Sequence, residues 1–149
     1  MKPSIFAVIF KIELMLVQDS PYYCNVINHK IVDIGNLYFF QNYLIAEINE
    51  GVNISFENFK ESTELILAHF GDNDFGFIGN RVNSYSIVIT DAREFNKAFK
   101  NLKAYATVTY NLFAENMLEV ENHFFNFNKK NFTTLIEAVT WVEENVSSN

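Results

Sequence analysis

Clustered positive charge is scarce in this chain of 149 residues, which has 11 lysines and arginines against 18 aspartates and glutamates and a net charge of −7. The basic residues are scattered, and Lys129–Lys130 is the only adjacent basic pair. Phosphate binding draws its affinity from clustered lysine and arginine. We therefore expect neither a nucleic acid nor an anionic membrane surface as the main partner.

Cysteine is nearly absent as well. Cys24 is the only one, which excludes an internal disulfide and a cysteine-based zinc site. His29, His69 and His123 lie far apart in the sequence, and none has a second ligand at metal-binding spacing. The chain has no G-x-S-x-G elbow and no cysteine with a convincing histidine partner. We expect no metal, no cofactor and no catalytic residues, and an enzyme ranks third among the functions considered.

Long hydrophobic runs are also missing. The apolar stretch Ile5–Phe10 resembles a signal peptide, but Lys11 and Glu13 interrupt it, and it is too short to span a bilayer. The length and the 49% hydrophobic content fit one domain. We expect a cytoplasmic protein with a single domain over residues 25–149. Residues 1–24 are read as an extension that the domain does not need, although an extra ordered strand or helix is the alternative, and Met15 could be the start of the protein.

The first half of the domain reads as strands. Short apolar and β-branched runs are separated by turn residues such as Gly35-Asn36 and Gln41-Asn42. Turns this tight predict an antiparallel meander. The predicted strands are Lys30–Ile34, Leu37–Phe40 and Tyr43–Ile48.

After Gly51, strand patterns alternate with helical periodicity, which requires crossover connections and a partly parallel sheet. The predicted order is β-β-β-α-β-α-β-α-(β)-α, an α/β fold with helices packed on a mixed sheet. The predicted elements are a helix over 56–70 with Ser55 as N-cap and Gly71 at its end, the strand Phe75–Ile78, a helix from Asp91 with Glu94 in a capping box, the strand Lys103–Tyr110, a helix over Phe113–Phe124, a short strand Phe125–Phe127, and a last helix from Thr134 with Glu137 in a second capping box.

One polar stretch, Gly79–Ser86, follows the predicted strand Phe75–Ile78 and precedes the helix at Asp91. In open α/β sheets, ligands bind beyond the carboxyl ends of the strands. Arg81 could pair bidentately with a carboxylate or phosphate. The alternative is a loop whose side chains satisfy its own backbone. The candidate binding residues are Asn80, Arg81, Asn83, Ser84, Tyr85 and Ser86, together with Tyr110 and Asn111 on the same rim.

Three segments resemble a known group. Asn80–Ile87 (N-R-V-N-S-Y-S-I), Thr107–Asn111 (T-V-T-Y-N) and Glu137–Val142 (E-A-V-T-W-V) are similar to small bacterial proteins of the STAS/SEC14 type, within the STAS-like or SpoIIAA-like domains. The resemblance covers about residues 30–146. It implies a SpoIIAA-like fold.

The resemblance also carries functional expectations. Better-studied domains of this layout are anti-sigma-factor antagonists, which bind a kinase and are switched by serine phosphorylation. Ser84 and Ser86 are the nearest candidates here, although the Asp-Ser-x-Gly signature is absent. We expect a non-enzymatic binding or regulatory domain that uses residues 80–86 to contact another protein or a small ligand, and a homodimer is allowed. The alternative is a carrier of a small or lipid-like molecule, which the 16% aromatic content favours.

Overall fold

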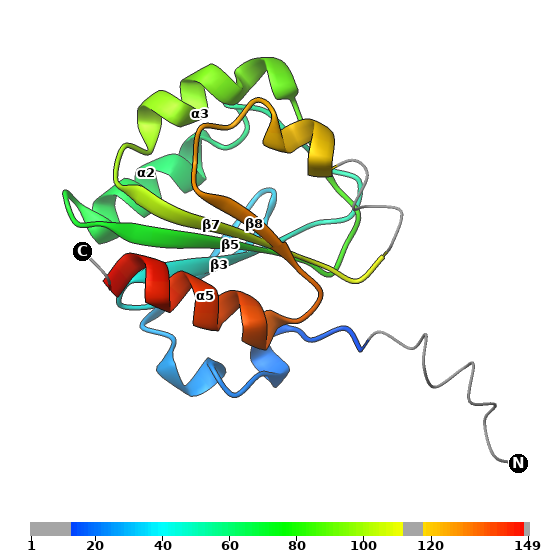
Figure 1. Cartoon of the computed structure of the whole chain (residues 1–149), viewed down its shortest axis with the longest axis vertical. Coiled ribbons are helices and arrows are strands. Elements are labelled where there is room, and N and C mark those ends of the chain that lie inside the picture. Colours follow the sequence, from blue (N-terminus) through cyan, green and yellow to red (C-terminus); the bar gives the residue numbers. More distant parts are fainter. Residues whose placement is uncertain (1–12, 112–117, 148–149) are drawn as a thin grey trace, which may run out of the picture.

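A computed structural model describes residues 13–111 and 118–147 (Figure 1). Its centre is a six-stranded sheet with the order β1-β2-β3-β5-β7-β8. The first three strands are antiparallel, and β3, β5, β7 and β8 run parallel to one another. This topology confirms the predicted mixed α/β fold. The strands are β1 Asn28–Val32, β2 Gly35–Phe39, β3 Tyr43–Ile48, β5 Phe75–Arg81, β7 Leu102–Thr109 and β8 Lys129–Phe132.

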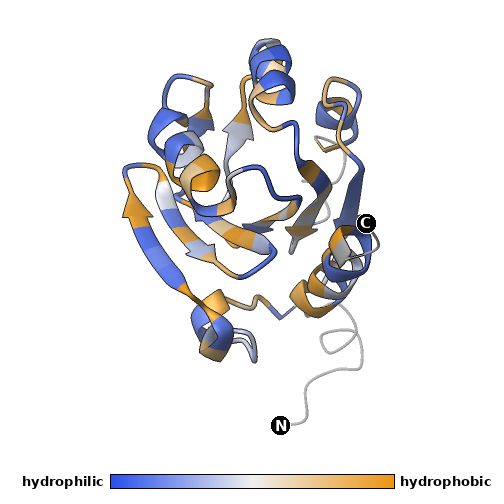
Figure 2. Ribbon diagram, turned by 90° about the vertical axis from the view of Figure 1, so that its left-hand side faces the viewer, coloured by the Kyte–Doolittle hydropathy of each residue, from blue (hydrophilic) through white to orange (hydrophobic). Residues whose placement is uncertain are grey.

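Helices cover both faces of the sheet (Figures 1 and 2). Helices α2 (Lys60–Phe70) and α3 (Ala92–Ala98) lie on one face, and α5 (Leu135–Ser147) lies on the other. Short 3-10 turns, η1 (Val17–Asp19) and η2 (Tyr23–Asn25), share the α5 face, and η3 (Ile89–Asp91) leads into α3. A small parallel pair, β4 (Asn53–Ile54) with β6 (Ser86–Ile87), and a helical stretch at 118–122 complete the described part.

The core has two halves, one on each face of the sheet. Because strand side chains alternate between faces, each inner strand contributes to both halves. The α5 half is aliphatic around Ile78, Val108 and Val142. The α2/α3 half is rich in phenylalanine, with Phe59, Phe70, Phe75, Phe95, Phe99 and Phe125 all buried.

Helix α2 begins later than predicted, whereas α3 begins after Asp91 as predicted but without the expected capping box. Residues 55–59 form a turn instead, in which Ser55 Oγ accepts the Asn58 N–H at 3.0 Å, and Phe59 precedes the first turn of α2. The Asp91 side chain does not cap α3, because its carboxylate accepts the Phe56 N–H at 2.9 Å. These polar groups join neighbouring segments of the chain. The predicted end of α2 at Gly71, at a φ of 58°, is confirmed.

The region before α5 also needs correction. No strand forms at Phe125–Phe127, whose outer residues turn into the aromatic core, and the strand lies at Lys129–Phe132 instead. Of the predicted helix Phe113–Phe124, residues 112–117 lie outside the described residues, and 118–122 are helical. The last helix begins as predicted, because Thr134 Oγ1 accepts the Glu137 N–H at 3.2 Å.

The N-terminal segment contacts the sheet. Val17 is fully buried, and its N–H donates to Glu47 Oε2 at 2.9 Å. The Met15 carbonyl accepts a 2.8 Å hydrogen bond from Asn80 Nδ2. These contacts argue against a domain boundary at residue 24, since the residues from Met15 onward are packed as part of the fold.

A substitution at Gly76 on β5 tests how closely α5 packs against the sheet. A Cβ at Gly76 would overlap Val142 Cγ1, so we expect Gly76→Ala to lower the free energy of unfolding by about 1–3 kcal/mol through overpacking. Gly79→Ala on the same strand is the control. Its Cβ would meet Tyr85 Oη at 3.0 Å and Phe77 Cε1 at 3.9 Å, and the cost should be smaller. Urea unfolding measures both, and equal losses would contradict the proposed contact.

Candidate functional site

The predicted site residues divide between the two faces of the sheet. The predicted loop is partly strand, because β5 continues to Arg81. Alternation along β5 sends Asn80 toward α5 and Arg81 toward the aromatic half of the core. The eight predicted residues therefore do not form one surface.

On the α5 face, Asn80 lies in a hydrogen-bonded cluster. It is fully buried, donates to Glu47 Oε2 at 2.8 Å, and accepts the Tyr110 hydroxyl at 2.7 Å. Tyr110 therefore meets Asn80, as its predicted position on the same rim suggests. Burial raises the pKa of Tyr110 to about 12. Burial also raises the pKa of the Glu47 carboxyl, and the hydrogen bonds from Val17 and Asn80 offset part of that rise. The cluster joins the N-terminal segment to the sheet.

On the aromatic face, Arg81 is enclosed. Its Nη2 donates to the Tyr85 carbonyl, its Nη1 lies 3.4 Å from Glu121 Oε2, and its guanidinium carbon lies 4.0 Å from the centre of the Tyr85 ring. The Arg81 and Glu121 side chains are only 7% and 4% exposed. Arg81 is thus paired within the fold and not offered to solvent.

The remaining loop residues bond to residues 48–53. Asn83 donates to the Ile48 carbonyl at 3.0 Å, and Ser86 Oγ bonds to Asn53 Oδ1 at 2.8 Å. Ser84 is exposed, and its N–H donates to Glu50 Oε2 at 2.7 Å. Asn111 is also exposed. These three bonds tie the loop to residues 48–53 and not to its own backbone.

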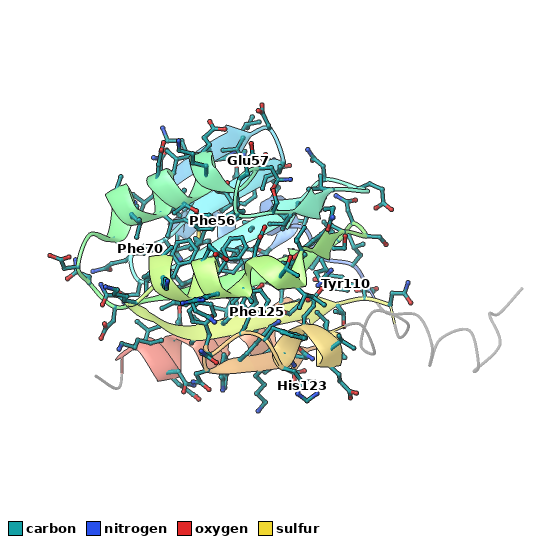
Figure 3. The ribbon with its side chains drawn as sticks, turned by 90° about the horizontal axis from the view of Figure 1, so that it is seen from above. Phe56, Glu57, Phe70, Tyr110, His123 and Phe125 are labelled. Carbon is teal, nitrogen blue, oxygen red and sulfur yellow. The ribbon has the colours of Figure 1, made fainter. Side chains whose placement is uncertain are left out.

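A cavity of about 40 Å³ lies inside the aromatic half of the core. In Figure 3, Phe125, one of its lining residues, lies beside α3 on the α2/α3 side of the sheet. The space exceeds the roughly 10–15 Å³ that a cavity needs to hold one water molecule. Its lining is almost wholly apolar: Ile48, Ile54, Phe59, Phe75, Phe77, Tyr85, Ile87, Phe95, Phe99, Leu102, Tyr105, Phe125 and Phe127.

Beside this cavity lies a buried cation. The Lys129 ammonium is 4.7 Å from the centre of the Tyr105 ring and 5.4 Å from that of Phe125. Its Nζ is buried and has no hydrogen-bond partner among the residues that the structure describes. Burial lowers the pKa of Lys129 to about 8, with Glu121 opposing that shift and Arg81 adding to it.

Two more buried polar atoms without partners in the described part of the chain lie next to Lys129. They are Thr107 Oγ1 on β7 and Asn131 Oδ1 on β8. The strand register pairs Thr107 with Asn131 and Tyr105 with Lys129, so all four side chains lie on one face. Buried polar groups are normally hydrogen-bonded, so three unpaired atoms at adjoining positions mark this patch as unusual.

Sequence reasoning missed Lys129, Thr107, Glu121 and the aromatic lining of the cavity. The available signal was the lone basic pair Lys129–Lys130, placed directly after the aromatic stretch Phe125–Phe127. Strand alternation turns Lys129 inward, while Lys130 lies over the Phe132 ring on the opposite face. The pairing with β7 that buries Lys129 is not visible in the sequence.

Comparisons with known proteins bear on the fold. No family model matches the chain, and the curated proteins give no match. The chain is similar to the crystal structure of an uncharacterised protein of the DUF3478 family with a SpoIIAA-like fold from Shewanella loihica PV-4. The TM-score is 0.49 and the identity 16%, over 77% of this chain and 90% of that chain. That description names a SpoIIAA-like fold for that protein.

Within residues 13–111 and 118–147, no helix is long and apolar enough to cross a membrane. No group of three or more His, Cys, Asp and Glu side chains there could hold a metal ion.

Glu47 yields a stability prediction with a pH dependence. Glu47→Ala leaves the Val17 N–H without an acceptor and removes one of the two acceptors of the Asn80 amide, so we expect a loss of about 1–3 kcal/mol in the free energy of unfolding. Glu47→Gln keeps an acceptor oxygen and should be much less harmful. Because the folded carboxyl has a pKa above its ordinary 4.5, wild-type stability falls as pH rises from 4.5 through the folded pKa.

Glu47→Gln should remove that part of the fall with pH. Urea unfolding between about pH 4 and pH 8 measures the slope. Identical slopes for Glu47→Gln and wild type would contradict a raised pKa for this carboxyl.

Lys129 yields a prediction of the opposite kind. Burial disfavours its charged form, so the cost to stability is fully present below pH 8 and disappears as pH rises from about 8 toward 10.5. Lys129→Met should raise the free energy of unfolding near neutral pH by about 1–3 kcal/mol. Lys130→Met, an exposed position on the other face, should change it by under about 0.5 kcal/mol. Thermal and urea unfolding measure both, and a destabilised Lys129→Met protein would refute the expectation.

Proposed function

We propose that this protein is a non-enzymatic binding domain that holds a small, mainly apolar molecule in the cavity between its sheet and helices α2 and α3. The observation that carries the proposal is the void itself. Protein interiors are close-packed, and an apolar void beneath so many aromatic rings leaves contacts unmade that a ligand would supply. Ligand sites are typically concave and apolar, with a few polar groups.

The size of the cavity limits the ligand. An apolar cavity of about 150 Å³ takes up benzene, so the roughly 40 Å³ present here must widen to admit a ring or a short branched chain. Phe125 and Phe127 line it from residues 123–128, which form neither helix nor strand. Displacing these two side chains breaks no ladder hydrogen bonds. The proposal is therefore a small molecule and not a long lipid chain.

The same geometry favours a ligand inside the cavity and disfavours the contact surface that the sequence predicts at residues 80–86. Most polar groups of that segment are engaged within the fold, and Tyr85 lines the cavity from it. A regulatory surface or a phosphorylated Ser84 stays a prediction from the sequence. No described arrangement of nucleophile and base leads us to propose catalysis.

A cavity-filling variant tests the proposal. Toluene, titrated into 15N-labelled protein, should shift the amide signals of residues that line the cavity. Ile87→Phe adds volume at a half-buried lining position and should weaken toluene binding by about tenfold or more. Ile136→Phe is the matched control, because Ile136 is exposed on α5, across the sheet.

Native mass spectrometry of freshly purified protein gives a second readout, since a bound molecule adds its mass. Toluene that shifts no lining residue, or that binds Ile87→Phe as tightly as wild type, would remove the support for the cavity as a ligand site.

A further inference from the structure

We propose, building on the proposed function, that the ligand is a small monocarboxylic acid whose carboxylate pairs with the Lys129 ammonium while its apolar tail lies among the aromatic side chains of the cavity. Two arguments support this assignment: the charge balance of the buried cluster, and the place of Lys129 against the cavity wall.

The buried charges beside the cavity do not balance. Arg81 and Lys129 contribute two positive charges and Glu121 one negative charge. Glu121 is within ion-pair distance of Arg81, and within the described ranges no carboxylate lies within that distance of Lys129. An unpaired buried ammonium is costly, and a carboxylate at this position would neutralise it with a charge-assisted hydrogen bond. The protein as a whole is acidic, so this local excess of positive charge is not a general property of the chain.

Lys129 does not itself line the cavity, but its ammonium lies over two rings that do. Tyr105 and Phe125 line the cavity, and the ammonium lies within 5.4 Å of both ring centres. The hydroxyl of Thr107, one pleat further along the same face, has a proton to donate to a second carboxylate oxygen.

The Tyr85 hydroxyl lies over the sheet at this point. Gly79 pairs with Thr107 in the register and places no side chain on this face, and the atom nearest to a Cβ built there is Tyr85 Oη, at 3.0 Å. The proposal places one carboxylate against both Lys129 and Thr107, two of the three unpaired polar groups on these strands.

The size of the cavity favours a monocarboxylate with a compact tail. A phenyl ring stacks on aromatic side chains in the offset or edge-to-face arrangements already present among these residues, as between Tyr105 and Phe77 at 5.2 Å. A second anionic group on the ligand would enter an apolar lining with no further unpaired cation and would oppose binding.

Binding of phenylacetate, 2-phenylethanol and acetate, measured by NMR titration of the full chain near neutral pH, tests the inference. The alcohol has the same tail without the charge, and acetate has the head without the tail. We expect wild type to bind phenylacetate about tenfold or more tightly than the alcohol, and to bind acetate weakest. Lys129→Met should abolish the preference for the acid while retaining the alcohol. Lys130→Met should behave as wild type, since its side chain lies on the opposite face.

The outcomes separate this inference from the proposed function. If the alcohol binds in the cavity as tightly as the acid, or if Lys129→Met keeps the preference, the carboxylate inference is wrong and the apolar site stands. If neither compound shifts the lining residues, both are overturned. If Lys130→Met loses the preference for phenylacetate as fully as Lys129→Met does, the preference reflects surface charge. That result would also overturn the inference.

Discussion

The parallel pairing of β5 with β7 is the constraint on which the rest of the structure depends. These central strands stay in register from Gly76 to Arg81, with every second side chain on the same face. Neighbouring residues therefore serve opposite halves of the core: Asn80 joins the cluster that holds the N-terminal segment, and Arg81 joins Glu121 at the edge of the aromatic half. A slip of one residue would exchange the two and bury each without its partner.

The alternation of side chains between the two faces of the sheet explains which features could be predicted from the sequence and which could not. The strands Tyr43–Ile48 and Leu102–Thr109 and the capping pair of Thr134 with Glu137 were predictable, because local composition alone identifies them. The continuation of β5 through Asn80 was not. A polar residue reads as loop unless its partners are known, and the partner of Asn80 is Glu47, 33 positions earlier in the chain.

The candidate site was hidden for a related reason. The residues that line the cavity come from segments far apart in the sequence. Many of them are phenylalanines, and in a chain with 16 phenylalanines no single one stands out as a site residue. Lys129 stands in a short edge strand of polar residues, K-K-N-F, which lacks the hydrophobic alternation that marks a strand. Only the pairing of Lys129 with Tyr105 makes one lysine of the pair internal and leaves the other outside.

Lys129 points to a function because another residue at this position would make the folded protein more stable. A methionine would fill similar space without a desolvated charge, and the rings of Tyr105 and Phe125 attract the ammonium by an amount that offsets only part of that cost. Natural proteins tolerate such losses mainly at functional sites, where a group is kept for what it binds. Glu47, by contrast, accepts two hydrogen bonds from within the fold. Lys129 has no such partner in the described chain, so its role is better explained by something that enters the cavity than by the fold itself.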